Sequence, residues 1–499
     1  WLVRGGRTRI YLLDTNIEEN PPAYRHLSAR LYVAEPEQRL QQEIVLGVGG
    51  VRVLRTLGIN PIVWHANEGH TAFMMLERVR EEMANGLSLP QAVNRVQATT
   101  VFTTHTPVLA GHDVFPVALV EKYWQSIGVG GEAFLRIGQR DGASDQFNMT
   151  AVGMRLASQR NAVSKNHQTV TRKMWHSLFA KVPEEQAPIS AVTNGIHVLT
   201  WIAPELGQLF EKYLSKNLRA EYDNPDLWDR IFDIPDGELW AVHQLLKRKL
   251  KSFILDRERP RFVGAHLTHQ RILTSGALLD AEALTIAFVR RFTEYKRPML
   301  ILRDPARLKR ILTNPLRPLQ IVFAGKSHPA DTASKRLLQQ VYVLASNPDF
   351  DGRIAFIEDY DLRLAHYLTQ GTDVWLNNPR RGQEACGTSG MKAALNGVLH
   401  LSVPDGWWLE GYNGTNGWSI GDPLHPVKPE AEDDTDAETL YRLLEDEIVP
   451  LFYDRDRYGV PHGWLQLVKE SIRSIVPVFC ARRMLKEYTE QMYIPATRY

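Results

Sequence analysis

Cysteine is scarce in this chain. Its 499 residues include two cysteines, Cys386 and Cys480, which is too few for a disulfide framework and typical of a reducing compartment. We therefore predict a cytoplasmic protein. On the same grounds we interpret the Asn-x-Thr sequences at Asn148 and Asn413 as chance matches rather than glycosylation sites.

Long apolar runs and an excess of one charge are also missing. No stretch reaches the roughly 18 apolar residues of a membrane-spanning helix. The opening sequence WLVRGGRTRIYLLD resembles an interior strand rather than a signal or transit peptide. Lysine plus arginine number 59 against 57 for aspartate plus glutamate, so the net charge is +2. These values exclude a global field that attracts nucleic acid or a membrane, and any anion must be bound by a local cluster.

Patterns that bind metal ions are not evident. His65 and His70 are five residues apart, and the sequence His-Glu-x-x-His, which places two zinc ligands on one helix face, does not occur. We predict that the protein has no metal site.

Short apolar runs do occur, and they alternate with helical patterns. The runs lie at 61–65, 99–104, 284–291, 319–325, 353–359 and 373–376. This alternation predicts an α/β protein with two parallel-sheet units, separated by a charged, helical segment at 203–280. The glycines of GVGG at 47–50 fall within a helical pattern, which favours close helix packing over a nucleotide loop. The acidic stretch 430–438 predicts a helix that begins with acids in its first turns.

The sequence EACGTSGMK at 384–392 combines a loop with the start of a helix. Gly387, Thr388 and Ser389 can end a strand and cap the helix that follows. The free N–H groups of such a helix start also bind anions such as phosphate. Lys392 lies about one helical turn further in, where a partly apolar setting suits an amine that bonds covalently to an aldehyde cofactor. Pyridoxal phosphate carries both the aldehyde and the phosphate.

Ser389 and Lys392 also match the Ser-x-x-Lys arrangement of β-lactamases and penicillin-binding proteins. The Ser-Asp-Asn and Lys-Thr-Gly sequences that accompany it in those enzymes do not occur in this chain. We therefore favour the cofactor interpretation of Lys392.

The sequence VRRFTEYKRP gathers four cations around one tyrosine, directly after an apolar run. We refer to Arg290, Arg291, Lys296 and Arg297 as the basic cluster; Tyr295 lies among them. Such a run is commonly a solvated basic edge. The carboxyl ends of parallel strands, however, are where open α/β sheets bind ligands, so the cluster can also be a clamp for two phosphates.

Polar groups follow the other apolar runs in the same way. They are HANEGH, TTHTPVLAGHD, VTNGIH, AGKSHP and IEDYD. Their histidine, amide and acid side chains form an inventory that can hydrogen-bond many hydroxyl groups at once, and a sugar fits it. The glycine- and tryptophan-rich stretch 405–418 is either a loop over a sugar site or a well-packed turn, and both interpretations stay open.

Six ordered motifs resemble those of the α-glucan (glycogen or maltodextrin) phosphorylases, in particular their shorter bacterial and archaeal branch. They are NEGH, TTHTP, VTNGIH, VRRFTEYKRP, AGK and EACGTSGMKAALNG. The resemblance extends from Trp1 to the C-terminal ARRMLKEYTEQMYIPA. It implies two Rossmann-like domains of the GT-B type, over 1–198 and 199–475, which face a cleft, and a C-terminal helix over 476–499 that packs back on the first domain.

The same resemblance implies an activity. The reaction is phosphorolysis of the terminal α-1,4-linked glucose of a glucan, which gives α-glucose 1-phosphate with retention of configuration. The cofactor is pyridoxal 5′-phosphate, the partners are glucan and inorganic phosphate, and a homo-oligomer is compatible with the family.

Roles for individual residues also follow from the resemblance. The expected cofactor-binding residues are Lys392, Gly387, Thr388, Arg290 and Tyr360. The expected catalytic residues are Arg291 and Lys296, which hold substrate phosphate, together with Lys392. The expected substrate-binding residues are Glu384, Cys386, Asn194, His105, Tyr295, Glu68 and His70.

Two positions depart from the family pattern. Cys386 stands where the family usually has serine, and a thiol is a weaker hydrogen-bond partner, so sugar affinity is expected to fall. Asp361 follows Tyr360 where longer phosphorylases have arginine, which removes the basis for borrowing a regulatory or cofactor role at that position.

Two rival functions use the same fold. A nucleotide-sugar glycosyltransferase, such as a glycogen synthase, has a Glu-x7-Glu pair, whereas here Glu384 is followed after seven residues by Lys392. A non-catalytic glucan-binding protein does not need Lys392, Arg291 and Lys296. Both comparisons favour a phosphorylase.

A last expectation concerns the N-terminal region. Members of the family carry a further N-terminal segment with a glycine-rich loop that faces substrate phosphate, and nothing between Trp1 and Val63 resembles that loop. We therefore expect a truncated first domain. We also expect the 499-residue chain alone to bind the cofactor weakly, to aggregate and to show little phosphorolysis, whereas the full-length protein is expected to be active.

Overall fold

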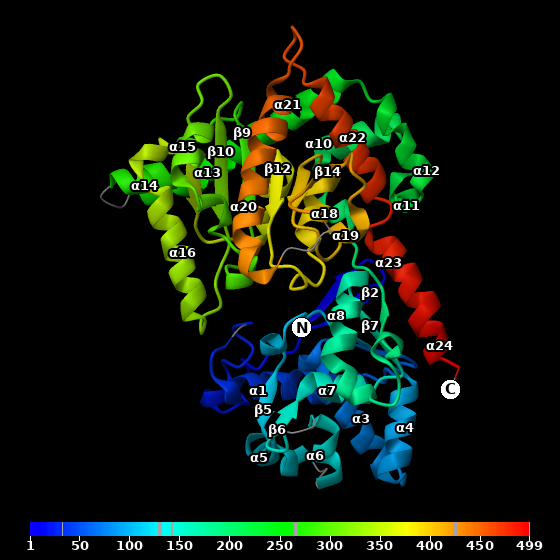
Figure 1. Cartoon of the computed structure of the whole chain (residues 1–499). Coiled ribbons are helices and arrows are strands. Elements are labelled where there is room, and N and C mark those ends of the chain that lie inside the picture. Colours follow the sequence, from blue (N-terminus) through cyan, green and yellow to red (C-terminus); the bar gives the residue numbers. More distant parts are fainter. Residues whose placement is uncertain (32, 128–131, 141–142, 264–267, 423–427, 499) are drawn as a thin grey trace. The chain divides into compact units, whose positions relative to one another are not determined.

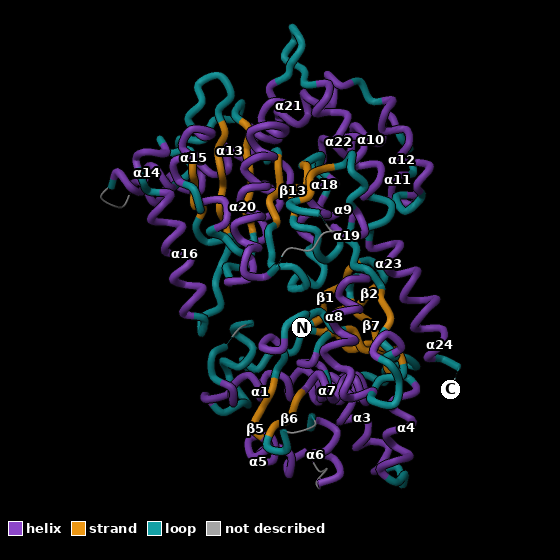
Figure 2. The backbone as a smooth tube through the Cα atoms, in the orientation of Figure 1, coloured by secondary structure: helices purple, strands orange, loops and turns teal. Residues whose placement is uncertain are grey.

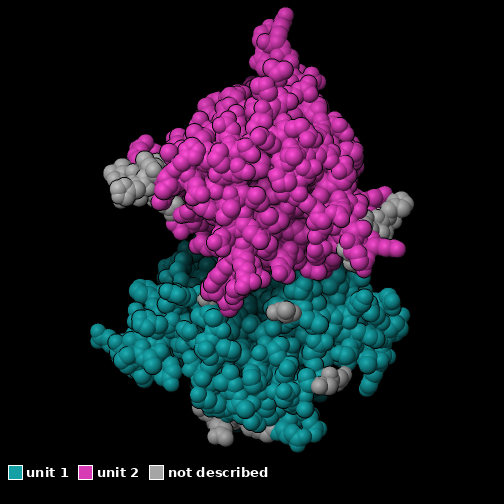
Figure 3. Space-filling model, turned by 60° about the vertical axis from the view of Figure 1, so that its left-hand side comes forward, with its two compact units in different colours: residues 1–192, 486–499 teal, residues 193–485 magenta. Residues whose placement is uncertain are grey.

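The computed structural model describes residues 1–31, 33–127, 132–140, 143–263, 268–422 and 428–498. Within these residues the chain forms two compact units (Figure 3). Unit 1 consists of residues 1–192 and 486–499, and unit 2 of residues 193–485. Each unit has its own parallel sheet and apolar core, which confirms the predicted α/β class.

The sheet of unit 2 has six parallel strands in the order β11-β10-β9-β12-β13-β14 (Figure 1). The strands are β9 (Leu284–Val289), β10 (Leu319–Ala324), β11 (Ile354–Ile357), β12 (Val374–Asn377), β13 (Leu399–Ser402) and β14 (Gly417–Ser419). The chain builds outward from β9 to β11 and then returns to the other side of β9 with β12. In this doubly wound order, ligands bind at the carboxyl ends of the two strands where the direction reverses, here β9 and β12.

Burial explains why the sequence pattern predicted these strands. Every residue of β9 and of β10 is buried, and parallel strands that are covered on both faces are continuous apolar runs. Figure 2 shows the strands of unit 2 flanked by helices. Three of these helices are α13 (Asp236–Val263), α17 (Leu362–Gly371) and α18 (Thr388–Leu395). One core cluster joins α13 and α17 to the strands through Leu250, Ile254, Ala287, Val322, Leu364, Leu368 and Trp375.

The predicted helical segment at 203–280 is helical in its described residues and belongs wholly to unit 2; residues 264–267 lie outside the described range. The remaining helices of unit 2 are α9 (Val198–Trp201), α10 (Pro204–Tyr213), α11 (Leu218–Glu221), α12 (Pro225–Trp228), α14 (His269–Thr274), α15 (Pro305–Leu312), α16 (Thr332–Ala345), α19 (Trp408–Gly411), α20 (Glu432–Leu443), α21 (Val449–Tyr453) and α22 (His462–Ile475). Helix α20 begins with three acids in its first turn, as predicted for the acidic stretch.

The sheet of unit 1 has four parallel strands in the order β3-β4-β7-β8. They are β3 (Trp64–Asn67), β4 (Thr100–Thr103), β7 (Gln159–Ala162) and β8 (Ser190–Ala191). The helices of unit 1 include α1 (Pro36–Ile44), α2 (Gly50–Thr56), α3 (Phe73–Ala84), α4 (Leu89–Ala98), α5 (Val117–Ile127), α6 (Glu132–Gly138), α7 (Met149–Arg155), α8 (Lys165–Trp175) and α24 (Ile494–Ala496). Unit 1 also contains a separate antiparallel pair of strands, β5 (Val114–Pro116) and β6 (Gln146–Asn148).

The C-terminal residues of unit 1 are fixed to its sheet. Helix α23 (Ala481–Tyr488) leads into them. The Tyr493 hydroxyl is 2.8 Å from His65 Nδ1, and Asn161 Nδ2 donates to the Tyr488 hydroxyl at 3.0 Å. Both contacts are made within unit 1, so residues 486–499 complete that unit.

The predicted role of the GVGG glycines is confirmed at Gly47, whereas a Cβ atom on Gly50 would meet nothing within 4 Å. A continuous helical stretch runs from α1 through a wider turn at Val45–Gly49 into α2. A Cβ atom on Gly47 would lie 2.6 Å from the Phe73 Cβ. The glycine therefore allows close approach to α3 rather than binding a nucleotide.

The opening segment differs from the prediction of one interior strand. Strands β1 (Leu2–Gly5) and β2 (Thr8–Tyr11) form an antiparallel hairpin in which only Tyr11 is half-buried and the other residues are exposed. Gly6 has φ of +60°, which glycine adopts without steric cost. The Gly5-Gly6 pair is thus a turn signal between two short strands.

The described residues contain neither a membrane-spanning helix nor a cluster of metal ligands. No helix there is long and apolar enough to span a membrane. No group of three or more His, Cys, Asp or Glu side chains in the same residues could hold a metal ion.

Candidate functional site

The carboxyl ends of β9 and β12 bring two members of the basic cluster, Arg290 and Lys296, to Glu384 in unit 2; Arg291 is exposed. Glu384 Oε2 is 2.5 Å from Arg290 Nη2 and 2.7 Å from Lys296 Nζ. The three side chains are at most 10% exposed, so Arg290 and Lys296 do not belong to a solvated edge. The arrangement is a buried acid between two cations, at the place where a doubly wound sheet binds its ligand.

Electrostatics keep the acid of this cluster ionised. Burial raises the pKa of Glu384, but the charges of Lys296 and Arg290 outweigh it and lower that pKa to about 2. Burial, followed by the charge of Arg290, lowers the pKa of Lys296 to about 8. Burial and then the charge of Glu384 raise the pKa of Tyr295 to about 12, while Arg291 acts on the same hydroxyl in the opposite direction. The two cations therefore hold Glu384 in its charged form.

One donor of the cluster has no acceptor. Arg290 Nη1 is buried and has no hydrogen-bond partner among the described residues. An unsatisfied buried donor costs about 1–3 kcal/mol, and a bound anion removes that cost. The site is therefore prepared for a further negative group.

Asp405 fixes the backbone that carries Glu384. Its Oδ2 accepts from the N–H groups of Gln383, at 3.1 Å, and of Glu384, at 2.9 Å. A Cβ atom on Gly406 would lie 2.4 Å from the Cys386 oxygen. Trp407 and Trp408 are fully buried. The start of the 405–418 stretch is therefore a well-packed turn beneath the site, and its role through Asp405 was not evident in the sequence.

Cys386 and Asn194 lie beside each other. Burial strongly raises the pKa of the Cys386 thiol, and a backbone hydrogen bond from Asn194 partly opposes it. The glycine of VTNGIH has a packing reason, because a Cβ atom on Gly195 would lie 2.3 Å from the Cys480 backbone. These contacts place the start of VTNGIH next to the loop of EACGTSGMK.

Helix α18 has an open N-terminus. Gly387 precedes it with φ of +90°, a left-handed conformation that favours glycine, and no side chain caps the first turn. The nearby Ser389 hydroxyl instead accepts from Trp375 Nε1 at 3.2 Å. The first N–H groups of α18 are therefore available to an anion, which is the arrangement that phosphate prefers.

Lys392 rests on an aromatic side chain. Its Nζ is 3.7 Å from the ring centroid of Trp201, which stacks on His366 with centroids 4.3 Å apart. Burial lowers the pKa of Lys392. Asn396 Nδ2 donates to the backbone oxygens of both Trp201 and Lys392 at 2.9 Å, which holds α9 against α18. The sequence analysis missed Trp201, and no local pattern marks it.

Tyr360 and Asp361 have other surroundings. Tyr360 packs on the apolar core of unit 2, and no contact among the described residues joins it to Lys392. Asp361 Oδ1 accepts from Leu364 N at 2.7 Å, which caps α17, and its Oδ2 pairs with Arg257 at 2.8 Å. The acid at 361 therefore has a structural role in this chain.

Unit 1 carries a second polar cluster, at the carboxyl ends of β3 and β4. Glu68 Oε1 accepts from His105 N and, at 3.2 Å, from the Thr104 hydroxyl. His105 Nε2 is 3.2 Å from Asn67 Oδ1. Glu68 has φ of +67°, a strained value for a residue with a side chain and one that is common at functional sites. Burial lowers the pKa of both His105 and His70, so both are neutral at pH 7.

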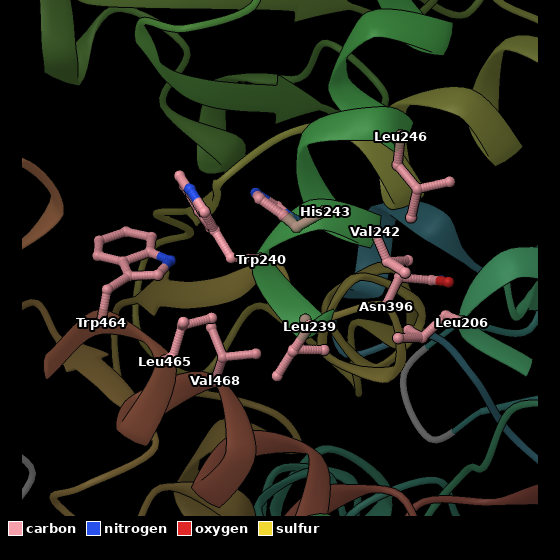
Figure 4. Close-up of a pocket in the computed structure, with 11 residues that line it drawn as sticks. Leu206, Leu239, Trp240, Val242, His243, Leu246, Asn396, Trp464, Leu465 and Val468 are labelled. Carbon is pink, nitrogen blue, oxygen red and sulfur yellow. The ribbon is translucent and has the colours of Figure 1, made fainter. Parts of the chain in front are cut away.

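A pocket in unit 2 shares only Asn396 with the residues described above, and Figure 4 shows the side chains that line it. It is lined mainly by the apolar side chains of Leu206, Leu239, Val242, Leu246, Leu465 and Val468. His243 and Asn396 are at its wall, and His243 contacts Asp373, which directly precedes β12. The pocket thus lies at the amino ends of the strands, whereas the predicted site residues follow their carboxyl ends.

Comparisons with known proteins give the family. The family model for carbohydrate phosphorylase matches residues 135–413. The chain is 46% identical over 501 residues to a glycogen phosphorylase of Aquifex aeolicus, with 99% of this chain and 71% of the relative covered. It is 46% identical over 500 residues to a maltodextrin phosphorylase of Thermococcus litoralis, with 99% and 58% covered.

A third relative has the same relationship. It is a glycogen phosphorylase of Mycobacterium bovis, 40% identical over 514 residues, with 100% of this chain and 59% of the relative covered. The chain thus spans between 58% and 71% of the length of these three relatives. Because the matches cover nearly the whole chain and include the site residues of unit 2, the chain belongs to the carbohydrate phosphorylase family.

Proposed function

We propose that the protein is an α-glucan phosphorylase, a glycosyltransferase of class EC 2.4.1.1. It transfers the terminal α-1,4-linked glucose of glycogen or maltodextrin to inorganic phosphate and releases α-glucose 1-phosphate with retention. The names of the relatives support this substrate class. The observation that carries the proposal is the buried Arg290–Glu384–Lys296 cluster at the switch point of the sheet, in the unit that holds the uncapped start of α18.

The charges of this cluster suit a phosphate substrate. Two cations face one carboxylate, and Arg290 retains an unused donor. In the proposed reaction Arg291 and Lys296 hold substrate phosphate and stabilise the charge that develops as the glycosidic bond breaks. Glu384, which stays ionised, accepts hydrogen bonds from glucose hydroxyls.

The residues of α18 fit pyridoxal phosphate. Lys392 would hold its aldehyde end, because burial lowers the pKa of this amine and so favours the neutral, nucleophilic form. The N–H groups at Gly387 and Thr388 would bind its phosphate, since no side chain competes for them. When bound, the cofactor supplies a phosphate with a second pKa near 6, which suits proton exchange with substrate phosphate. Arg290 and Tyr360 remain proposed neighbours of this group.

The sugar is proposed to contact neutral polar groups. In unit 2 these are Asn194, Cys386 and Tyr295, and in unit 1 they are His105 and His70, with Glu68 as an acceptor. Both histidines are neutral at pH 7 and can donate and accept hydrogen bonds without attracting anions. The parallel sheet in each unit supports the GT-B type of organisation, and the two buried free cysteines support a reducing, cytoplasmic location.

The test is release of glucose 1-phosphate from maltoheptaose and phosphate by the full-length protein supplied with pyridoxal phosphate. The proposal expects release that depends on both phosphate and cofactor. Transfer from a nucleotide sugar without a need for phosphate would instead indicate a nucleotide-sugar transferase. Glucan binding without turnover would indicate a non-catalytic glucan-binding protein.

A further inference from the structure

Arg297 is the last cation of the basic cluster, and it joins the two segments that meet at the switch point. It is 5% exposed. Its Nε donates to the Asn378 oxygen and its Nη2 to the Pro379 oxygen, both at 2.9 Å. Asn378 Nδ2 donates back to the Arg297 oxygen at 2.9 Å. Three hydrogen bonds therefore connect the segment after β9 to the segment after β12.

The same guanidinium also reaches helix α20. Its Nη2 is 2.7 Å from Asp436 Oδ2, and its Nη1 is 3.0 Å from Asp433 Oδ1. Asp436 is fully buried and also pairs with Arg381 at 2.8 Å. The Arg297 backbone has φ of +48°, which a non-glycine residue keeps only where its surroundings fix it. The contacts to α20 and to residues 378–379 provide that constraint.

Lys296 lies between two of these fixed points. The next residue is Arg297, and the preceding residue, Tyr295, accepts from Arg380 N through its backbone oxygen at 2.7 Å. The Lys296 side chain in turn contacts Glu384. The backbone on both sides of Lys296 is thus attached to the segment 378–380.

We propose that Arg297 is a positioning residue: by fixing residues 295–297 to residues 378–380 and to α20, it holds the Lys296 ammonium at Glu384, where substrate phosphate binds. The role of the phosphate rests on the proposed function. The position of Lys296 does not, and the two can be tested separately.

The first test compares Arg297→Ala and Arg297→Lys with the matched control Arg303→Ala. Arg303 also pairs with α20, through Asp434 at 2.5 Å, but its side chain is 46% exposed. Arg297→Ala is expected to raise the KM for phosphate about tenfold or more and to leave the KM for glucan within about twofold. The KM for phosphate of Arg297→Lys should lie between those of Arg297→Ala and the unchanged protein. Lysine keeps the positive charge but loses the planar guanidinium that bonds several acceptors at once. Arg303→Ala should match the unchanged protein.

A parallel rise in both KM values, or an unchanged KM for phosphate, would overturn the proposal.

The second test needs no turnover. The protein is treated with limiting acetic anhydride, and acetylation of Lys296 and of Lys469 is measured by mass spectrometry. Both lysines are buried, at 8% and 3% exposed, and Lys469 pairs with Asp236 away from the cluster.

Arg297→Ala should accelerate acetylation of Lys296 about fivefold and leave Lys469 unchanged, because only the local anchor is lost. Equal acceleration at both lysines would show a general loss of stability and would overturn the positioning role, as would an unchanged rate at Lys296. If the unchanged protein shows no phosphorolysis but Lys296 responds as expected, the proposed function fails and the positioning role stands.

Discussion

The two ends of the sheet in unit 2 are built from the same kinds of groups. At the carboxyl end, Glu384 lies between Arg290 and Lys296. At the amino end, Asp373 is 2.7 Å from His243 Nε2 and 2.5 Å from Lys247 Nζ. Each end therefore has one buried acid with two basic partners.

The two clusters differ in how completely their hydrogen bonds are made. At the amino end, Lys247 also donates to the Ala283 oxygen and Asp373 accepts from Thr285 N, both at 2.7 Å, so the cluster fastens α13 to β9 and β12. At the carboxyl end, Arg290 Nη1 has no partner among the described residues. The same chemistry stabilises the fold where every group is paired, and it is prepared for a ligand where a donor is left over.

The largest expected effect belongs to Lys392, in the helix that follows the carboxyl end. Lys392→Ala should lose the bound cofactor and reduce turnover about 10⁴-fold, because the covalent attachment is gone. The measurements are the absorption band of the bound cofactor and the mass of the peptide modified after borohydride reduction. A pyridoxyl group on a peptide without residue 392 would contradict the assignment.

Asp373→Ala should affect stability and not substrate use. It leaves Lys247 buried without its acid, which costs about 3–5 kcal/mol in the free energy of unfolding. Urea denaturation measures this cost. Asp349→Ala is the control, because Asp349 pairs with Lys309 on the surface and its loss should cost less than about 1 kcal/mol. A change in the KM for phosphate of the folded Asp373 variant would contradict the purely structural role of the cluster at the amino end.

Lys296→Ala and Arg291→Ala should impair substrate use rather than stability. Each removes a charge from a site that is proposed to hold two crowded anions, so transition-state stabilisation should fall by about 2–4 kcal/mol, or roughly 30- to 1000-fold in rate. Phosphate use should suffer far more than glucan binding. Initial rates at varied phosphate and varied glucan separate the two, and an unchanged phosphate dependence in both variants would place the phosphate clamp elsewhere.

The smallest expected effect is a pH dependence set by Lys296. Its pKa is about 8, so the ammonium that is proposed to hold phosphate is lost as the pH rises through that value. The kcat/KM for phosphate should fall about tenfold one unit above it. The free energy of unfolding should not fall in parallel. The unfolded chain binds the Lys296 proton more tightly than the folded chain, so this group adds to the stability of the fold as the pH rises above about 8. Lys296→Arg should move the falling limb to higher pH, and an unmoved limb would assign it to another group.

The sequence predicted the elements whose signals are local. Buried parallel strands such as β9 and β10 are continuous apolar runs, and α20 begins with its acids in the expected turn. The run 61–65 indicated its strand imperfectly, because β3 begins at Trp64 and Ile62 is 71% exposed. The exposed hairpin at the start was missed, since its apolar residues suggest burial and only the Gly5-Gly6 pair signals the turn.

Contacts between distant segments were beyond local patterns. Lys392 was singled out from its helix start, but Trp201, which supports it, comes from another part of the chain and has no motif of its own. Asp405 and Arg297 act in the same way, through backbone groups that the fold brings near. The catalytic, cofactor-binding and substrate-binding roles of all the predicted site residues stay predictions.

The thiol beside Glu384 has a consequence for the chemistry of the intact protein. Burial raises the pKa of Cys386, and also that of Cys480, so neither forms the thiolate that reacts with oxidants or alkylating reagents. The Cys386 thiol therefore does not react with these reagents while the turn at 405–406 covers its backbone. When that turn lifts, the thiol becomes reactive, so the rate at which a reagent consumes it measures how often the loop of unit 2 opens. Labelling of the Cys386 thiol would thus report on local unfolding at this loop.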